Sequence, residues 1–88
     1  MRLDKWLWAA RFFKTRGQAA DAADGGRVKL NGAAAKPARE LKPGDRLNIR
    51  TESEDCEVEV LGFNAQRRPA AEARLLYRET PESLKKRA

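Results

Sequence analysis

The period of the apolar residues changes near the start of the chain, and this change constrains the fold most. The first apolar residues repeat at the three-and-four spacing of one helical face. They are Leu3, Trp6, Leu7, Ala10 and Phe13. After Gly25 and Gly26, residues 27–30 alternate with the period of a strand, and Asn31-Gly32 is a dipeptide typical of a hairpin turn. The pattern predicts helical segments followed by a strand and a hairpin.

A second helix is predicted to begin at Thr15, because Thr15 and Gln18 have the spacing of a capping box. In this motif each side chain binds a backbone amide of the first turn that would otherwise lack a partner. Gly25 and Gly26 are expected to end the helix. Because residues 19–24, AADAAD, contain no large apolar side chain, this helix must pack closely and contribute only modestly to stability.

The following residues predict a small antiparallel sheet. Residues 33–35 are expected to return from the hairpin, and residues 36–45 to form a loop and a turn. Residues 46–51 and 56–61 alternate apolar and polar side chains, which is typical of strands with one buried and one solvated face. They would complete the sheet that residues 27–30 begin.

A last helix is predicted from Pro69, because proline favours the first position of a helix. One side of this helix would carry Ala73, Leu76 and Tyr77. Pro81 either breaks it or starts a further turn, and residues 83–88 are expected to form a frayed basic end. The predicted fold class is α+β, with two N-terminal helices packed on a small, twisted, mainly antiparallel sheet and a C-terminal helix.

Short motifs in the first half of the chain match a known family pattern. The pattern places Arg-Leu-Asp at the start of the first helix, a basic turn before the second, and set residues along the strand, hairpin and loop. The matching residues are Arg2, Leu3, Asp4, Lys14, Thr15, Arg16, Gly26, Val28, Asn31, Gly32, Lys36, Pro37, Gly44 and Asp45. In these positions the chain resembles the RNA-binding domain shared by a small-subunit ribosomal protein, tyrosyl-tRNA synthetases and many pseudouridine synthases. The resemblance implies its αL-type RNA-binding motif. Gly17 departs from the pattern, which usually has serine there.

Two longer strings resemble one branch of this family more closely. WLWAARFFKTR at residues 6–16 and QRRPAAEARLLYRET at residues 66–80 are similar to the bacterial fifteen-kilodalton heat-shock proteins that bind the large ribosomal subunit. The resemblance implies an RNA-binding domain over residues 1–64 and a helical extension over residues 65–88 that packs on it. These relatives continue into a longer, lysine-rich tail, so we expect weaker binding here if that tail contributes affinity.

The charge is concentrated in the half of the chain that carries the motifs. Residues 1–50 contain twelve Lys and Arg against five Asp and Glu, a net charge of +7, whereas residues 51–88 contain seven against eight, a net charge of −1. A basic surface of this kind favours phosphate and makes binding sensitive to salt. The acidic hairpin at residues 52–59 should face away from a nucleic acid. Bound RNA is therefore expected across the two helices.

Composition excludes several other classes of function. Cys56 is the one cysteine and the sequence has no histidine, so neither an internal disulfide nor a zinc site is expected. A chain of 88 residues buries a small core, which makes a deep catalytic cleft improbable. Apolar runs are too short to span a bilayer, and no signal-peptide core follows Met1. We expect a cytoplasmic protein that is not an enzyme and needs no metal or cofactor.

The predicted RNA contacts are mainly basic side chains of the helices, the strand and the following loop. They are Arg2, Lys5, Arg11, Lys14, Thr15, Arg16, Arg27, Lys29 and Lys36. Lys14 and Arg16 rank first, because they flank the turn where free amides of the second helix could also bind a phosphate. For each basic residue taken singly, the alternative is a solvated face. Asp4 is interpreted as a structural residue that caps the first helix or pairs with an arginine.

Trp8 and Phe12 have two interpretations. They could stack on unpaired bases, or the C-terminal helix could cover them through Leu76 and Tyr77. The second interpretation is favoured, because the closer resemblance includes both the aromatic helix and the C-terminal string.

The function expected from the residues is phosphate-based binding of structured RNA with little reading of bases. The resemblance further implies a monomer that binds large-subunit ribosomal RNA and tRNA, on subunits stalled with a nascent chain on tRNA during heat stress. Two alternatives remain open at this point. One is an accessory RNA-binding domain that acts with a separate modifying enzyme, such as a pseudouridine synthase. The other is general RNA or DNA binding.

Overall fold

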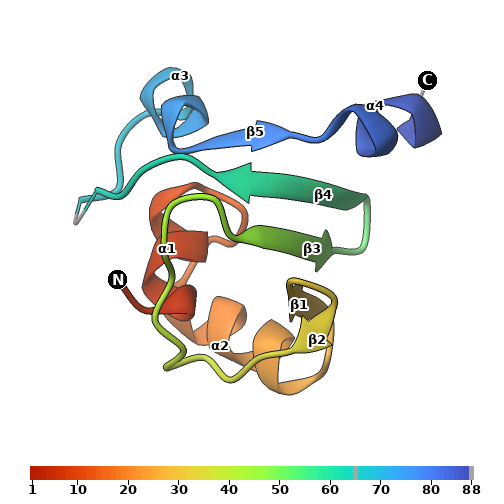
Figure 1. The fold of residues 1–88 in the computed structure, drawn as a ribbon. Coiled ribbons are helices and arrows are strands. Elements are labelled where there is room, and N and C mark those ends of the chain that lie inside the picture. Colours follow the sequence, from red (N-terminus) through yellow and green to blue (C-terminus); the bar gives the residue numbers. More distant parts are fainter. Residues whose placement is uncertain (65, 88) are drawn as a thin grey trace.

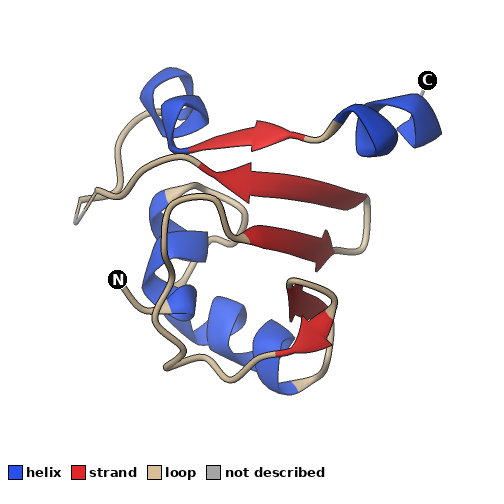
Figure 2. Ribbon diagram, viewed as in Figure 1, coloured by secondary structure: helices blue, strands red, loops and turns tan. Residues whose placement is uncertain are grey.

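The sheet has five strands, and all its pairings are antiparallel in the order β2-β1-β3-β4-β5 (Figures 1 and 2). The structure, a computed structural model, describes residues 1–64 and 66–87. Its elements are α1 (Leu3–Ala9), α2 (Arg16–Asp24), β1 (Val28–Leu30), β2 (Ala33–Ala34), β3 (Arg46–Arg50), β4 (Asp55–Val60), α3 (Ala70–Ala73), a 3-10 turn (Arg74–Leu76), β5 (Tyr77–Glu79) and α4 (Pro81–Arg87). The predicted α+β class is confirmed.

One face of the sheet forms the core with α1 and α2. The strand register aligns Leu47 with Val58 and Ile49 with Cys56, so their buried side chains share this face. The Trp6 side chain is fully buried against them, and its indole nitrogen donates to the Gly62 carbonyl at 2.9 Å. This bond satisfies the one polar group of a large buried ring.

Helix α1 ends earlier than the apolar stripe predicted. Arg11 has φ 68°, and its amide donates to the Trp8 carbonyl at 3.0 Å, while the Phe12 amide donates to the Leu7 carbonyl at 3.0 Å. This pair of bonds is a Schellman motif, with arginine at the left-handed position that usually holds glycine. Phe13 was therefore wrongly placed on the helix: it lies in the following turn, half-buried against the core.

Helix α2 and the hairpin follow the predicted pattern. The Thr15 hydroxyl accepts from the Gln18 amide at 3.0 Å, and the helix ends at Asp24 before Gly25. A capping box has two side-chain bonds, and this bond from the Gln18 amide to the Thr15 hydroxyl is the one found among the described residues. Asn31 and Gly32 have φ 50° and 86° between β1 and β2, as a type I′ hairpin turn requires.

The helix predicted from Pro69 is much shorter than expected. Its α-helical part is Ala70–Ala73, a 3-10 turn follows, and Tyr77 begins β5 opposite Val60. The Leu76 carbonyl accepts from the amides of Leu61 and Gly62 at 2.8 and 3.2 Å. Placing Tyr77 on a continuous helix was wrong, because the open edge of β4 offers backbone partners that a strand can satisfy.

The frayed end predicted from residue 83 was also wrong over residues 83–87, which are helical in α4; Ala88 lies outside the described residues. Pro81 begins the helix, and the Thr80 hydroxyl accepts from the Ser83 amide at 3.3 Å. The buried Ser83 hydroxyl accepts from the Glu57 amide at 3.0 Å and donates to the Glu79 carboxylate at 2.7 Å. These bonds join α4 to β4 and β5.

The left-handed backbone at Arg11 gives a stability prediction. We expect Arg11→Gly to be about 1 kcal/mol more stable than Arg11→Ala, because only glycine adopts this φ without a steric cost. Both variants lose the same side chain, so the comparison isolates the backbone. Urea denaturation of the two variants measures the difference, and equal midpoints would contradict the assignment of strain.

Candidate nucleic-acid interface

A buried carboxylate organises the basic residues at the start of the chain. Asp4 is 5% exposed and accepts a forked pair of bonds from the Arg2 guanidinium, at 3.2 and 3.1 Å. Arg16 lies in the first turn of α2. One of its guanidinium nitrogens is 3.7 Å from Oδ1 of Asp4. The Lys5 amide also donates to this oxygen at 2.7 Å. Asp4, Arg2 and Arg16 are called the Asp4 cluster below.

The Asp4 cluster confirms a structural role for Asp4 and links the two helices. A buried carboxylate must be paired and hydrogen-bonded to offset its loss of hydration. Here its partners are two cations whose side chains stay about half exposed, 49% for Arg2 and 47% for Arg16. The carboxylate therefore holds one side of the Arg2 guanidinium by hydrogen bonds and attracts that of Arg16 across 3.7 Å, and both arginines keep N–H groups facing solvent.

A loop adds further positive charge beside this cluster. The first amides of α1, those of Leu3 and Asp4, donate to the carbonyls of Arg39 and Pro37 at 2.8 and 3.1 Å. The loop thus caps the helix with backbone oxygens and brings Lys36 and Arg39, both exposed, to the start of α1. Sequence reasoning missed Arg39, because an arginine in an irregular loop has no periodic pattern to mark it.

Lys14 and Arg27 come together in a separate hollow between α2 and the ends of β1 and β3. Arg50 lines the same hollow, where its amide donates to the Arg27 carbonyl at 2.8 Å. The register that places the end of β3 beside the start of β1 was not readable from sequence, so Arg50 was not predicted. Glu52 also borders this hollow, so this part of the acidic hairpin does not face away from the basic side as expected.

Lys29 and Arg11 lie outside both basic groups, and Thr15 serves as a helix cap. Lys29 lies between buried neighbours on β1, so its side chain is on the sheet face opposite the core. Arg11 lies beyond the C-terminal end of α1, and its guanidinium donates to the Arg68 carbonyl at 3.3 Å. The Thr15 hydroxyl accepts from the Gln18 amide as the cap of α2, which leaves its own O–H able to donate.

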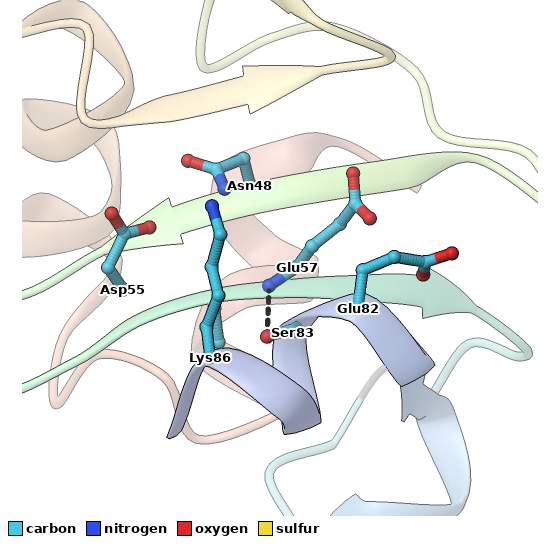
Figure 3. A pocket seen from close by; sticks show the side chains of 7 residues that line it. Asn48, Asp55, Glu57, Glu82, Ser83 and Lys86 are labelled. Atoms are coloured by element: carbon cyan, nitrogen blue, oxygen red, sulfur yellow. Dashed lines mark hydrogen bonds between the residues drawn. The ribbon is translucent and has the colours of Figure 1, made fainter. Parts of the chain in front are cut away.

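The opposite face of the sheet carries a hollow under α4 that is rich in carboxylates (Figure 3). Asp55, Glu57 and Glu82 line it, and the Lys86 side chain extends toward Asn48. Three carboxylates against one ammonium group disfavour a phosphate here. The electrostatics of the described residues therefore favour an anion on the helical side over this face.

The aromatic side chains of α1 and its following turn are used in packing. The Phe12 ring lies 6.0 Å from that of Trp6 and 4.8 Å from that of Tyr77, measured between centroids. Trp8 is half-buried against the core, and its carbonyl accepts from the Arg67 guanidinium at 3.2 Å. The packing interpretation is confirmed for Phe12, although Tyr77 reaches it from a strand.

Metal-binding groups and membrane-spanning helices are not found among residues 1–64 and 66–87. Histidine, cysteine, aspartate and glutamate side chains form no group of three or more there that could hold a metal ion. The helices of this part of the chain include none with the length and apolar character needed to cross a membrane.

Comparisons with known proteins agree with this geometry. The S4 domain family matches residues 1–47. A trimeric structure of Vibrio cholerae heat shock protein 15 matches with a TM-score of 0.95 and 45% identity, over 99% of this chain and 88% of that one. The heat shock protein 15 homolog of Aeromonas salmonicida is 49% identical over this whole chain and 67% of its own length. The RQC P-site tRNA stabilizing factor of Listeria innocua is 38% identical over 90% of this chain and 88% of its own length.

The fold and the basic helical side define an S4-domain protein, the RNA-binding class that the motifs resemble. Within this class, the chain belongs to the heat shock protein 15 family. It spans 65–67% of the length of the curated heat-shock relatives. None of the relatives' names denotes an enzyme.

The Asp4 cluster predicts that a substitution of Asp4 changes RNA affinity in the direction opposite to that expected from net charge. Asp4→Asn removes a negative charge, which by itself should strengthen RNA binding. We expect RNA affinity instead to fall by about threefold or more, because the arginine forks lose their anchor, and stability to fall by about 1–3 kcal/mol. Filter binding at fixed salt and urea denaturation measure the two effects.

Asp24→Asn is the matched control, because Asp24 is exposed at the end of α2, does not line the hollow of Lys14 and Arg27, and forms no ion pair among the described residues. It makes the same charge change and should leave affinity equal or slightly higher. Tighter binding by both variants would contradict a positioning role for Asp4.

Proposed function

We propose that this chain binds structured RNA through its phosphates, with the Asp4 cluster at the centre of the contact surface. The observation that carries the proposal is the buried Asp4 carboxylate with the guanidinium groups of Arg2 and Arg16 held against it. Arginine is suited to phosphate because its planar fork can form two parallel charge-assisted bonds. Holding each fork in advance lowers the conformational entropy lost when phosphate binds.

The contact surface extends from this cluster to both sides. Lys36 and Arg39 lie beside the start of α1, and Lys5 follows Asp4 in the same helical turn. Lys14, just before α2, and Arg27, just after it, continue the positive surface in the hollow that they share with Arg50. A surface of this kind reads the spacing of phosphates in folded RNA, and it carries little base-edge chemistry.

The proposed target is ribosomal RNA of the large subunit, together with tRNA, on subunits stalled with a nascent chain during heat stress. Two names among the relatives support it: the heat shock protein 15 of the Aeromonas and Vibrio relatives, and the P-site tRNA stabilizing factor of Listeria. The protein would then act in the cytoplasm, without catalysis. A single copy would suffice for contact, although the Vibrio structure is described as trimeric.

Sedimentation tests the ribosomal target. Tagged protein from heat-stressed cells is expected to migrate with free large subunits in a sucrose gradient, and Arg16→Ala is expected to reduce this fraction about tenfold, as loss of a charge-assisted phosphate contact predicts. Lys85→Ala is the matched control: it removes one exposed cation from α4 and should leave migration unchanged.

Wild-type protein that stays at the top of the gradient would contradict the ribosomal target. In that case, binding of the same protein to free structured RNA at low salt would still support the phosphate-binding surface. A preference for duplex DNA over structured RNA would contradict RNA as the target.

A further inference from the structure

A third hollow lies at the far end of α1 from the Asp4 cluster. It is bordered by the turn after α1, the β3–β4 turn and the segment from α3 to β5, and it has a volume of about 450 Å³. This size is within the range of small-molecule sites. The predicted RNA surface does not include it, apart from Arg11.

Aromatic rings form one side of this hollow. Phe12 and Tyr77 both line it, with ring centroids 4.8 Å apart and planes inclined at 49°. The Tyr77 ring also packs against the Trp6 ring in a T-shaped arrangement, with 6.3 Å between the ring centroids. Its hydroxyl makes no hydrogen bond to the residues that the structure describes, and burial raises its pKa, so the hydroxyl remains a proton donor at neutral pH. A ring of this kind offers a stacking surface and a polar group.

Two guanidinium groups border the same hollow. Arg11 and Arg74 both line it, and neither forms an ion pair within the described part of the chain. Two features fix the position of the Arg11 side chain: the left-handed backbone of this residue and the bond from its guanidinium to the Arg68 carbonyl. Non-glycine residues with a left-handed backbone are often found at functional sites. Glu54 lies on the same border and would repel a phosphate placed near it.

We propose that this hollow holds one unpaired nucleotide of the bound RNA, with its base against the Tyr77 ring and its phosphate between Arg11 and Arg74. The inference rests on the proposed RNA-binding function and adds to it a contact with single-stranded character. The two halves of a nucleotide match the two kinds of lining, since every base has an aromatic face and every phosphate is an anion. The β3–β4 turn, which includes Glu54, would then form the wall of the hollow away from the phosphate.

Fluorescence anisotropy with two labelled RNAs tests this site. The probes are one RNA duplex and the same duplex with a single bulged uridine, measured at fixed salt. Wild-type protein is expected to bind the bulged RNA about fivefold to tenfold more tightly, which is the lower end of the range expected from stacking one base. Arg74→Ala should remove this preference and leave duplex binding nearly unchanged, while Glu54→Gln should strengthen binding of the bulged RNA.

Lys85→Ala again serves as the matched control, because it removes a cation far from the hollow and should keep the preference. Equal wild-type affinity for the two RNAs, or a preference that survives in Arg74→Ala, would overturn the nucleotide site while leaving the phosphate-binding surface intact. Failure of wild-type protein to bind either RNA would overturn the proposed function itself, and the nucleotide site with it.

Discussion

The buried carboxylate of Asp4 is the interaction on which the basic side of the molecule depends. Its side chain holds Arg2 and Arg16, and its backbone amide donates to the Pro37 carbonyl, so one residue joins α1, α2 and the loop before β3. Without a paired carboxylate, like charges at the start of two packed helices would repel one another. The internal ion pairs therefore let the fold concentrate positive charge on its surface.

The extension completes the molecule at the other end of α1. Tyr77 packs its ring against Phe12 and Trp6, and the strand that carries it covers the edge of β4. Helix α4 then turns over the opposite face of the sheet, where Ser83 is buried against β4. The result is a molecule with two unlike faces, one helical and basic, the other a sheet face whose hollow under α4 is lined by carboxylates.

Local sequence signals predicted the N-terminal part of the fold well. The cap at Thr15, the glycines after α2 and the Asn31-Gly32 turn each depend on a few neighbouring residues, and the structure confirms them. The signals failed where distant backbone decided the outcome. The stripe that runs through Phe13 has helical period, yet α1 ends at Ala9, and residues around Tyr77 have helix propensity but pair with β4.

The candidate site shows the same division. The family motif identified Asp4 and the basic residues Arg2, Lys14 and Arg16, and the charge along the predicted strand identified Arg27. Arg39 and Arg50 become neighbours of these groups only through the loop and the strand register. The sequence by itself determined the RNA-binding class, the excess of positive charge and the helix caps, because these depend on composition and on contacts close along the chain. The tertiary structure decided where Lys29 and Arg11 lie. Lys29 is on the sheet face opposite the core because side chains alternate along β1. Arg11 lies at the C-terminal end of α1, because the Schellman motif ends the helix there. The tertiary structure alone formed the hollow beside Tyr77, since that hollow requires three segments distant in sequence to meet.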